Sequence, residues 1–482
     1  MKDLIKTTTA ISGTEIALMV VAIIRNKYLA VNIGPEGFGI YGLIQSFFSL
    51  ASIFSGAWLA GGVTKFTSEY NKKNDNIAVQ KIASLSIVLT AVLSLVITFA
   101  FIVAQKPMRK IFLSEEVLSI YFILFAASFL GTSLRPVFIA LLQGLKQVKS
   151  VVAFRIIVSL ADVIFVIILV YFFDLIGFFF SILATSLVAI LIMWKQFNKH
   201  VGKFSFPSFH ENITNSLLFF GGSCFFLSML TFGGQYFLRF IVVKNINIAS
   251  VGLLQAATGI MKYLGIFNRG AVFHFYPEIS EEMSSSDRTG KINDYLRFIL
   301  LINIPITVIA ILFGKQILLL LYSSKFLPLS DLLFWFFLVH LMSCIAGTFH
   351  SNLMGMGLVK NFTLFGVLGT FLLLVVPTLF IKKYGLASVA IGYLLSYTGT
   401  IPLFYWHLKR RINFKFSHKI YYLLFIATLT ISISITFMNH NLLFRIICGV
   451  VTLLLIGLMV QKEEYSKLLV LVKNKVKGKR HE

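Results

Sequence analysis

The sequence predicts an all-α polytopic membrane protein with about 14 transmembrane helices. Of its 482 residues, 57% are hydrophobic, and the mean hydropathy is +0.87. Apolar stretches follow one another from about residue 8 to residue 460. Each approaches the roughly 20 residues that a helix needs to cross about 30 Å of hydrocarbon. No connection is long enough to hold a folded domain, so we expect one membrane unit without a catalytic module outside it.

Short polar connections separate the expected helices. In chain order the helices span about residues 8–30, 38–61, 82–104, 117–142, 150–173, 175–194, 214–242, 250–276, 295–313, 329–354, 361–381, 385–406, 420–438 and 442–460. The first stretch contains Glu15 and Arg25, which suit a retained helix rather than a cleavable signal peptide. Cys224, Cys344 and Cys448 fall inside these stretches, so we expect buried thiols rather than disulfides.

A repeat runs through the first twelve expected helices. The matched pairs are Gly39 with Gly252, Gly144 with Gly355 and Ser68 with Ser280, at displacements of 213, 211 and 212 residues. Six helices per repeat give both halves the same orientation, as two parallel lobes around a central cavity with substrate near the membrane midplane. The expected divisions are an N-lobe over 1–200, a C-lobe over 201–412, two accessory helices over 413–460 and a basic cytoplasmic tail over 461–482.

The formal charge of +24 follows the positive-inside rule rather than the pattern of a nucleic-acid-binding surface. With the N-terminus inside, most of the 43 Lys and Arg residues fall in cytoplasmic segments. The largest clusters are Lys409-Arg410-Arg411 and the tail from Lys473 to Arg480. Both termini are therefore expected in the cytoplasm, and nucleic acid is not expected as a partner.

Six cations inside the expected helices are candidate substrate-binding residues: Arg25, Arg239, Lys262, Arg269, Arg135 and Arg155. A charge at the helix centre costs roughly 2.5–3.5 kcal/mol, so most of them must face a polar cavity or a partner. Their expected depths form a ladder from the cytoplasm to the exterior, which suits an anionic substrate and in particular a phosphate. The alternatives are snorkelling to the headgroups and, for Arg135, donation to a backbone carbonyl freed by Pro136.

Two acids lie in the same expected membrane region. Asp162 follows Arg155 by seven residues on nearly the same helix face, and Glu15 lies in the inner half of the first helix. Each either balances the arginines or titrates as a coupling group. His340, in the middle of an expected helix, is either hydrogen-bonded between helices or a proton relay.

Motifs for catalysis and for cofactors are missing from the sequence. It has no Gly-x-x-x-x-Gly-Lys-Ser/Thr loop for ATP and no His or Cys spacing typical of a metal site. We therefore expect a transporter rather than an enzyme, with no cofactor and no metal. Its energy source would be a gradient, the membrane potential or the concentration difference of the substrate.

Several short motifs resemble those of O-antigen-type (Wzx) flippases in the multidrug/oligosaccharidyl-lipid/polysaccharide (MOP) exporter superfamily. They are the runs Leu29–Gly39 and Gly62–Tyr70, the pair Val251-Gly252, and the runs Tyr276–Ser280 and Ser324–Phe326. The two terminal helices depart from the shorter members of the superfamily. The resemblance implies a flippase that moves undecaprenyl-diphosphate-linked oligosaccharide from the inner to the outer leaflet of the bacterial plasma membrane by alternating access.

The resemblance also implies a cavity lined by cations, for which Arg25, Arg239, Lys262 and Arg269 are the candidates by depth. It implies a monomer that works with a polysaccharide polymerase and chain-length machinery. A lipid II flippase and a cation-coupled multidrug exporter of the same superfamily remain alternatives, although an exporter of cations should show acids in its cavity. A membrane glycosyltransferase or O-antigen polymerase is a different class and needs a catalytic loop that the sequence lacks. The pathway, whether O-antigen, capsule or another surface glycan, stays open.

Overall fold

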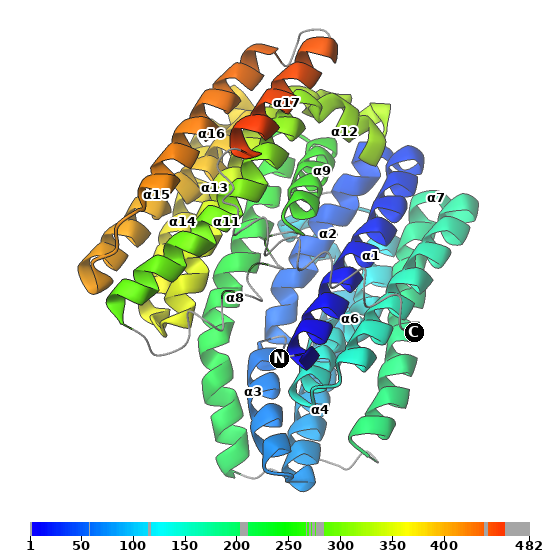
Figure 1. The fold of residues 1–482 in the computed structure, drawn as a ribbon. Helices are drawn as coiled ribbons and strands as arrows, with labels where there is room; N and C mark the ends of the chain where they lie inside the picture. The colour runs from blue at the N-terminus through cyan, green and yellow to red at the C-terminus, as the bar shows by residue number, and fades with distance from the viewer. Residues whose placement is uncertain are drawn as a thin grey trace, which may run out of the picture. The chain divides into compact units, whose positions relative to one another are not determined.

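The computed structural model describes residues 2–56, 58–113, 117–202, 211–266, 284–437 and 442–457, together with positions 268, 271 and 275. All regular structure in these residues is helical (Figure 1). The helices are α1 (Lys2–Asn32), α2 (Gly34–Phe54), α3 (Leu59–Lys72), α4 (Asn76–Val103), α5 (Gln105–Phe112), α6 (Ser119–Gly144), α7 (Val148–His200), α8 (Glu211–Asn245), α9 (Ile248–Leu264), α11 (Ser285–Leu312), α12 (Gly314–Leu321), the 3-10 helix η1 (Ser324–Leu329), α13 (Ser330–Gly355), α14 (Val359–Tyr384), α15 (Leu386–Ile412), α16 (His418–Phe437) and α17 (Leu442–Gly457).

Every expected apolar stretch overlaps one of these helices. Within the described residues, nine helices are long and apolar enough to cross a membrane, and α9 and part of α17 are shorter apolar helices. The prediction of an all-α polytopic membrane protein is therefore confirmed.

Helix α7 contains two of the expected spans and breaks where the sequence predicts their boundary. Asp174, between the stretches 150–173 and 175–194, has φ 49° and ψ −130°, which is not helical. After this turn the chain returns so closely that a Cβ at Gly177 would lie 1.9 Å from the carbonyl oxygen of Leu169. Only glycine fits at this position, because any Cβ would collide with the backbone of the first half of α7. The turn at Asp174 and the close contact at Gly177 together set how the two halves of α7 meet.

The chain divides into two compact units. One comprises Met1–Ile266, Leu318–Phe336 and Val359–Thr400, and the other comprises Phe267–Ile317, Phe337–Leu358 and Ile401–Glu482. Helices α1 to α9 belong to the first unit. The expected lobe boundaries near residues 200 and 412 remain predictions.

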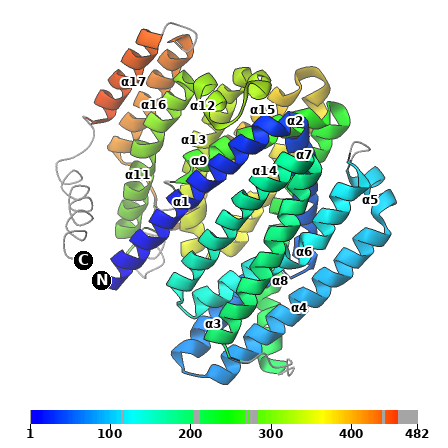
Figure 2. The same cartoon turned by 90° about the vertical axis from the view of Figure 1, so that its right-hand side faces the viewer.

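The first unit is built around α2. Helix α2 packs against α8 and α9, α6 packs against α3, α4 and α7, and α1 lies along α7 (Figure 2). An aromatic cluster joins α2, α4 and α6, and its members are Phe47, Phe48, Phe101, Phe122, Phe125 and Phe129. In a membrane, van der Waals packing of this kind holds helices together because lipid is as apolar as the side chains.

Two glycines matched by the repeat meet where α2 crosses α9. A Cβ at Gly39 would lie 1.9 Å from the carbonyl oxygen of Ile248, and one at Gly252 would lie 1.8 Å from that of Pro35. The same 213 residues separate Pro35 from Ile248 and Gly39 from Gly252, so each repeat makes the same contact with the other. Such reciprocity is the property of a two-fold relation between contacting surfaces. Small residues allow this close approach of backbones in a membrane.

In the second unit, α11, α16 and α17 pack together. A buried polar contact joins α11 to α13, with His340 Nε2 3.1 Å from Asn303 Oδ1. The expectation that His340 is hydrogen-bonded between helices is thus confirmed. Cys344 and Cys448 are buried free thiols, as predicted, whereas the side chain of Cys224 lies outside the described part of the chain.

Candidate functional site: a cationic pocket among α1, α2, α6 and α7

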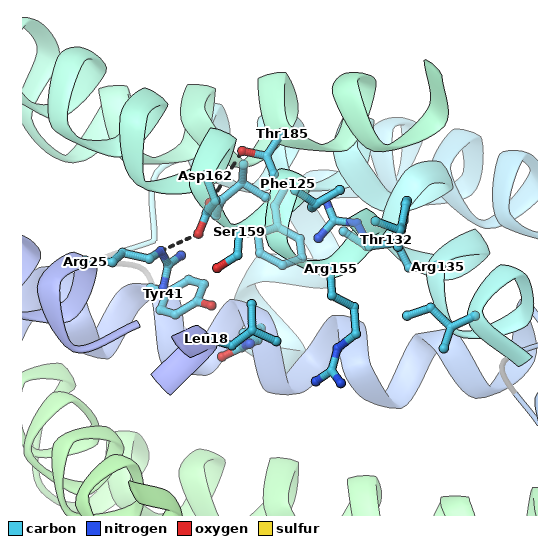
Figure 3. A pocket seen from close by; sticks show the side chains of 15 residues that line it. Leu18, Arg25, Tyr41, Phe125, Thr132, Arg135, Arg155, Ser159, Asp162 and Thr185 are labelled. Carbon is cyan, nitrogen blue, oxygen red and sulfur yellow. Dashed lines mark hydrogen bonds and ion pairs between the residues drawn. The ribbon is translucent and has the colours of Figure 1, made fainter. Parts of the chain in front are cut away.

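The first unit contains a pocket of about 450 Å³ among α1, α2, α6 and α7 (Figure 3). Its lining residues are Leu18, Arg25, Tyr41, Gln45, Phe125, Thr132, Arg135, Ile139, Phe154, Arg155, Val158, Ser159, Asp162, Ile182 and Thr185. All four helices contribute polar side chains to a pocket inside the apolar part of the unit. Across the described residues, no group of three or more His, Cys, Asp or Glu could hold a metal ion. The lining side chains offer charge and hydrogen bonds to a ligand.

Two ion pairs connect α1 with α7 along the pocket. Arg25 Nε lies 2.7 Å from Asp162 Oδ2, and Arg155 Nη1 lies 2.5 Å from Glu15 Oε1. Glu15 precedes Arg25 along α1, and their partners follow in the same order along α7, Arg155 before Asp162. The two helices therefore run in the same direction with complementary charges. Such pairing specifies the register of the two helices and lowers the cost of holding four charges in a membrane.

Arg25 lies among aromatic as well as acidic partners. Its guanidinium carbon is 5.8 Å from the ring centroid of Tyr41 and 5.3 Å from that of Phe178, distances at which a cation is attracted to a ring face. It also donates to Asn26 Oδ1 at 3.3 Å, and its side chain is only 16% exposed. Of the two positions that the sequence allowed, snorkelling or a cavity, the structure places Arg25 in the pocket.

Arg135 lies in the same pocket and takes part in neither of the ion pairs that hold Arg25 and Arg155. Helix α6 carries it directly before Pro136. Its Nε is buried, and no described residue accepts a hydrogen bond from it. The carbonyl freed by the proline, the alternative partner expected from the sequence, is therefore not used here. A half-buried guanidinium with a donor that no protein atom accepts from is an open site for an anion.

The pocket has an excess of one positive charge. Arg25, Arg135, Arg155 and Asp162 line the pocket, and Glu15, which is not a lining residue, pairs with Arg155 beside it. Because the acids pair with two of the three arginines, the excess charge lies on Arg135. Each paired guanidinium keeps further N–H donors. An anion with several oxygens can therefore contact Arg135 and compete with the acids for the other two.

The other three predicted cations lie elsewhere. Arg239 is buried in α8 and donates from Nη2 to Gln255 Oε1 at 2.7 Å. Lys262 is exposed in the last turn of α9 and does not line the pocket. Arg269 lies outside the described residues. The structure thus gathers half of the predicted cations and Asp162 around one pocket, with Glu15 paired to the lining residue Arg155.

Sequence reasoning missed the uncharged polar residues of this site. They are Gln45, Thr132, Ser159 and Thr185. Thr185 Oγ1 donates to Asp162 Oδ1 at 3.4 Å, which helps to hold that carboxylate. The available signal was spacing, since Tyr41 and Gln45 are one turn apart in α2 and so share a helix face.

Two sequence comparisons relate this chain to a family of polysaccharide biosynthesis proteins and to a lipid III flippase. The model of a family described as polysaccharide biosynthesis protein matches residues 4–262, more than half of the chain. The chain is also 21% identical over 380 residues to the lipid III flippase of Escherichia coli (strain K12). That match covers 77% of this chain and 90% of the relative.

Solved structures with the same fold are transporters of the MOP superfamily. The lipid II flippase MurJ in an inward closed conformation has a TM-score of 0.73 at 16% identity, over 96% of this chain and 100% of that one. An inward-facing multidrug resistance MATE family transporter has a TM-score of 0.73 at 15% identity, over 83% and 98% of the two chains. A MOP superfamily transporter from Pyrococcus furiosus has a TM-score of 0.65 at 15% identity, over 85% and 96%. At these identities the likeness establishes the fold.

Proposed function

Because the chain belongs to the polysaccharide biosynthesis protein family and has a MOP transporter fold, we propose that it is a flippase for undecaprenyl-diphosphate-linked oligosaccharide. It moves the repeat unit of a surface polysaccharide from the inner to the outer leaflet of the bacterial plasma membrane by alternating access. The observation that carries this proposal is the unpaired Arg135 in a polar pocket that also holds Arg25 and Arg155.

A diphosphate matches the charge and the donors of this pocket. Arginine binds phosphate oxygens through two parallel N–H donors, and the Nε of Arg135 donates to no described residue. A diphosphate that reaches Arg25 or Arg155 competes with Asp162 or Glu15 for the guanidinium. Its release restores the two ion pairs. In this mechanism the acids reset the empty pocket and do not carry a proton in each cycle.

The alternatives within the superfamily differ in the charge or the head group of the substrate. An exporter of cationic drugs needs an excess of acids, whereas the described pocket has an excess of one cation. A lipid II flippase would bind the same diphosphate. The match to a family of polysaccharide biosynthesis proteins favours an oligosaccharide precursor instead, and so does the lipid III flippase relative.

We further propose the setting in which this transport occurs. The distribution of Lys and Arg supports cytoplasmic termini, and the 213-residue repeat supports parallel lobes over 1–200 and 201–412. Lys262 and Arg269 would lie on the substrate path between these lobes. The transporter would act as a monomer and deliver its product to a polysaccharide polymerase and chain-length machinery.

Flipping in proteoliposomes tests the proposed function. The vesicles carry undecaprenyl-diphosphate-linked oligosaccharide, and a glycosidase added outside reports the sugar that becomes accessible. We expect Arg135→Gln to slow flipping about 10- to 100-fold, because a hydrogen bond to a charged group contributes about 1.5–3 kcal/mol. Arg411→Gln makes the same change at an exposed residue of α15 and should flip like the wild type. A wild type that flips nothing, or an unimpaired Arg135→Gln, would contradict the proposal.

A further inference from the structure

A chain of hydrogen bonds runs from buried Arg239 to the edge of the pocket. Arg239 Nη2 donates to Gln255 Oε1 at 2.7 Å, and Gln255 Nε2 donates to Gln45 Oε1 at 3.3 Å. The three residues come from α8, α9 and α2, all within the first unit. Gln45 lines the pocket, whereas Arg239 and Gln255 do not.

The chemistry of arginine determines the direction of this chain. A guanidinium has only donors, so Gln255 must turn its carbonyl oxygen toward Arg239 and its amino group toward Gln45. Gln45 must in turn present its carbonyl oxygen to Gln255. Its own amino group is then left to donate, and no described residue accepts from it. Arg239 thus acts through Gln255 to keep the amino group of Gln45 turned away from α9.

Glycines in α2 make room for this arrangement. The close approach of Gly39 to α9 brings the two helices together at that point. Three residues further along α2, a Cβ at Gly42 would lie 3.3 Å from Gln255 Oε1 and 3.5 Å from its Cδ. The side chain of Gln255 therefore lies against the bare backbone of α2, one turn before Gln45. Gly39, Gly42 and Gln45 share this face of α2 through a spacing of three residues.

We propose that Gln45 is a substrate-binding residue that donates to a phosphate oxygen of the lipid-linked diphosphate, with Gln255 and Arg239 as positioning residues. This inference rests on the proposed function. Phosphate oxygens only accept hydrogen bonds, so they select the donating end of the amide. Arg135 on α6 supplies the charge for the same ligand. Arg239, which is 6% exposed, acts through the orientation of the two amides and does not contact the substrate.

Gln255→Glu reverses the hydrogen bond between positions 255 and 45 while keeping the size and shape of the side chain. A carboxylate at position 255 would accept from Arg239 with one oxygen and from the Gln45 amino group with the other. Gln45 would then present its carbonyl oxygen to the pocket and repel a phosphate. We expect the protein to be at least as heat-stable as the wild type, since a buried arginine gains an acidic partner. Binding of undecaprenyl diphosphate in nanodiscs should weaken at least tenfold.

Three further variants separate positioning from a merely structural role. Gln45→Leu should weaken binding of undecaprenyl diphosphate to a similar degree. Gln45→Lys combined with Gln255→Glu should restore binding, because an ammonium has three donors and can serve both the carboxylate and the substrate. Gln143→Glu makes the same chemical change at an exposed position at the end of α6 and should bind like the wild type. Binding of uncharged undecaprenol should not respond to any of these changes.

Binding of undecaprenyl diphosphate separates a failure of the Gln45 role from a failure of the flippase function. If the wild type binds undecaprenyl diphosphate and Arg135→Gln weakens that binding, while Gln255→Glu and Gln45→Leu bind normally, the role of Gln45 is wrong and the flippase proposal stands. A loss of heat stability in Gln255→Glu that parallels its loss of binding would also overturn the positioning role. If the wild type does not prefer undecaprenyl diphosphate over undecaprenol, the proposed function itself fails.

Discussion

Gly252 determines how closely α9 approaches α2, and Gly252→Ala tests that contact directly. The new Cβ would lie 1.8 Å from the carbonyl oxygen of Pro35, more than 1 Å inside the 3.0 Å that real Cβ contacts respect. The opposing atom belongs to the backbone and cannot rotate away, so the helices must separate. Overpacking of this kind costs about 1–3 kcal/mol of stability. The separation should also stretch the 3.3 Å hydrogen bond from Gln255 to Gln45.

Thermal unfolding of the purified protein in detergent measures this effect. Gly39→Ala should be destabilised to a similar degree, because its Cβ would lie 1.9 Å from the carbonyl oxygen of Ile248. Gly347→Ala is the matched control within α13, since no atom lies within 4 Å of the added Cβ. There we expect unchanged or slightly higher stability, because alanine favours a helix over glycine by roughly 0.5–1 kcal/mol. If Gly252→Ala were as stable as Gly347→Ala, the reciprocal contact between the repeats would be wrong.

Further predictions concern the charges and the energy source. Asp162→Asn removes the partner of Arg25, so undecaprenyl diphosphate should bind about tenfold more tightly, a gain of about 1.4 kcal/mol in binding free energy. Turnover should fall, because release of the substrate no longer restores an ion pair. Weaker binding would refute the competition between the diphosphate and Asp162 for Arg25. At matched pH and sodium, net flipping should follow an imposed membrane potential, because moving two charges across 100 mV changes the free energy by about 4–5 kcal/mol. A response only to a proton or sodium gradient would instead make Asp162 or Glu15 a coupling group. Lys262→Ala should abolish surface polysaccharide at normal protein levels in the membrane, and normal polysaccharide would remove Lys262 from the substrate path.

Much of the fold was predictable because the membrane imposes it. Long apolar runs located the helices, and the polar Asp174 between two of them marked the break in α7. The repeat singles out Gly39 and Gly252 in the sequence itself. Which helices these glycines join was not predictable, because a glycine in the sequence shows that a close approach is tolerated and does not show with which helix.

The three arginines that line the pocket were among the six predicted cations, but the sequence could not separate them from the other three or show how they pair. The seven-residue spacing placed Arg155 and Asp162 on one face of α7, but it could not show that this face meets α1. The expected depths of the cations form a ladder, yet Arg25 and Arg155 line one pocket because α1 and α7 pair at two levels. Gln45 escaped notice because a pattern of charges does not register an uncharged amide, although an unpaired amide is also costly to bury in a membrane.

We propose that the pocket around Arg135 binds the diphosphate of a lipid-linked sugar. An experimental structure of the protein with undecaprenyl diphosphate bound in nanodiscs tests it most directly. We predict that the diphosphate lies in the pocket among α1, α2, α6 and α7, with phosphate oxygens within hydrogen-bonding distance of the Arg135 guanidinium. A diphosphate bound elsewhere, with the Arg135 guanidinium making no contact to it, would contradict the claim.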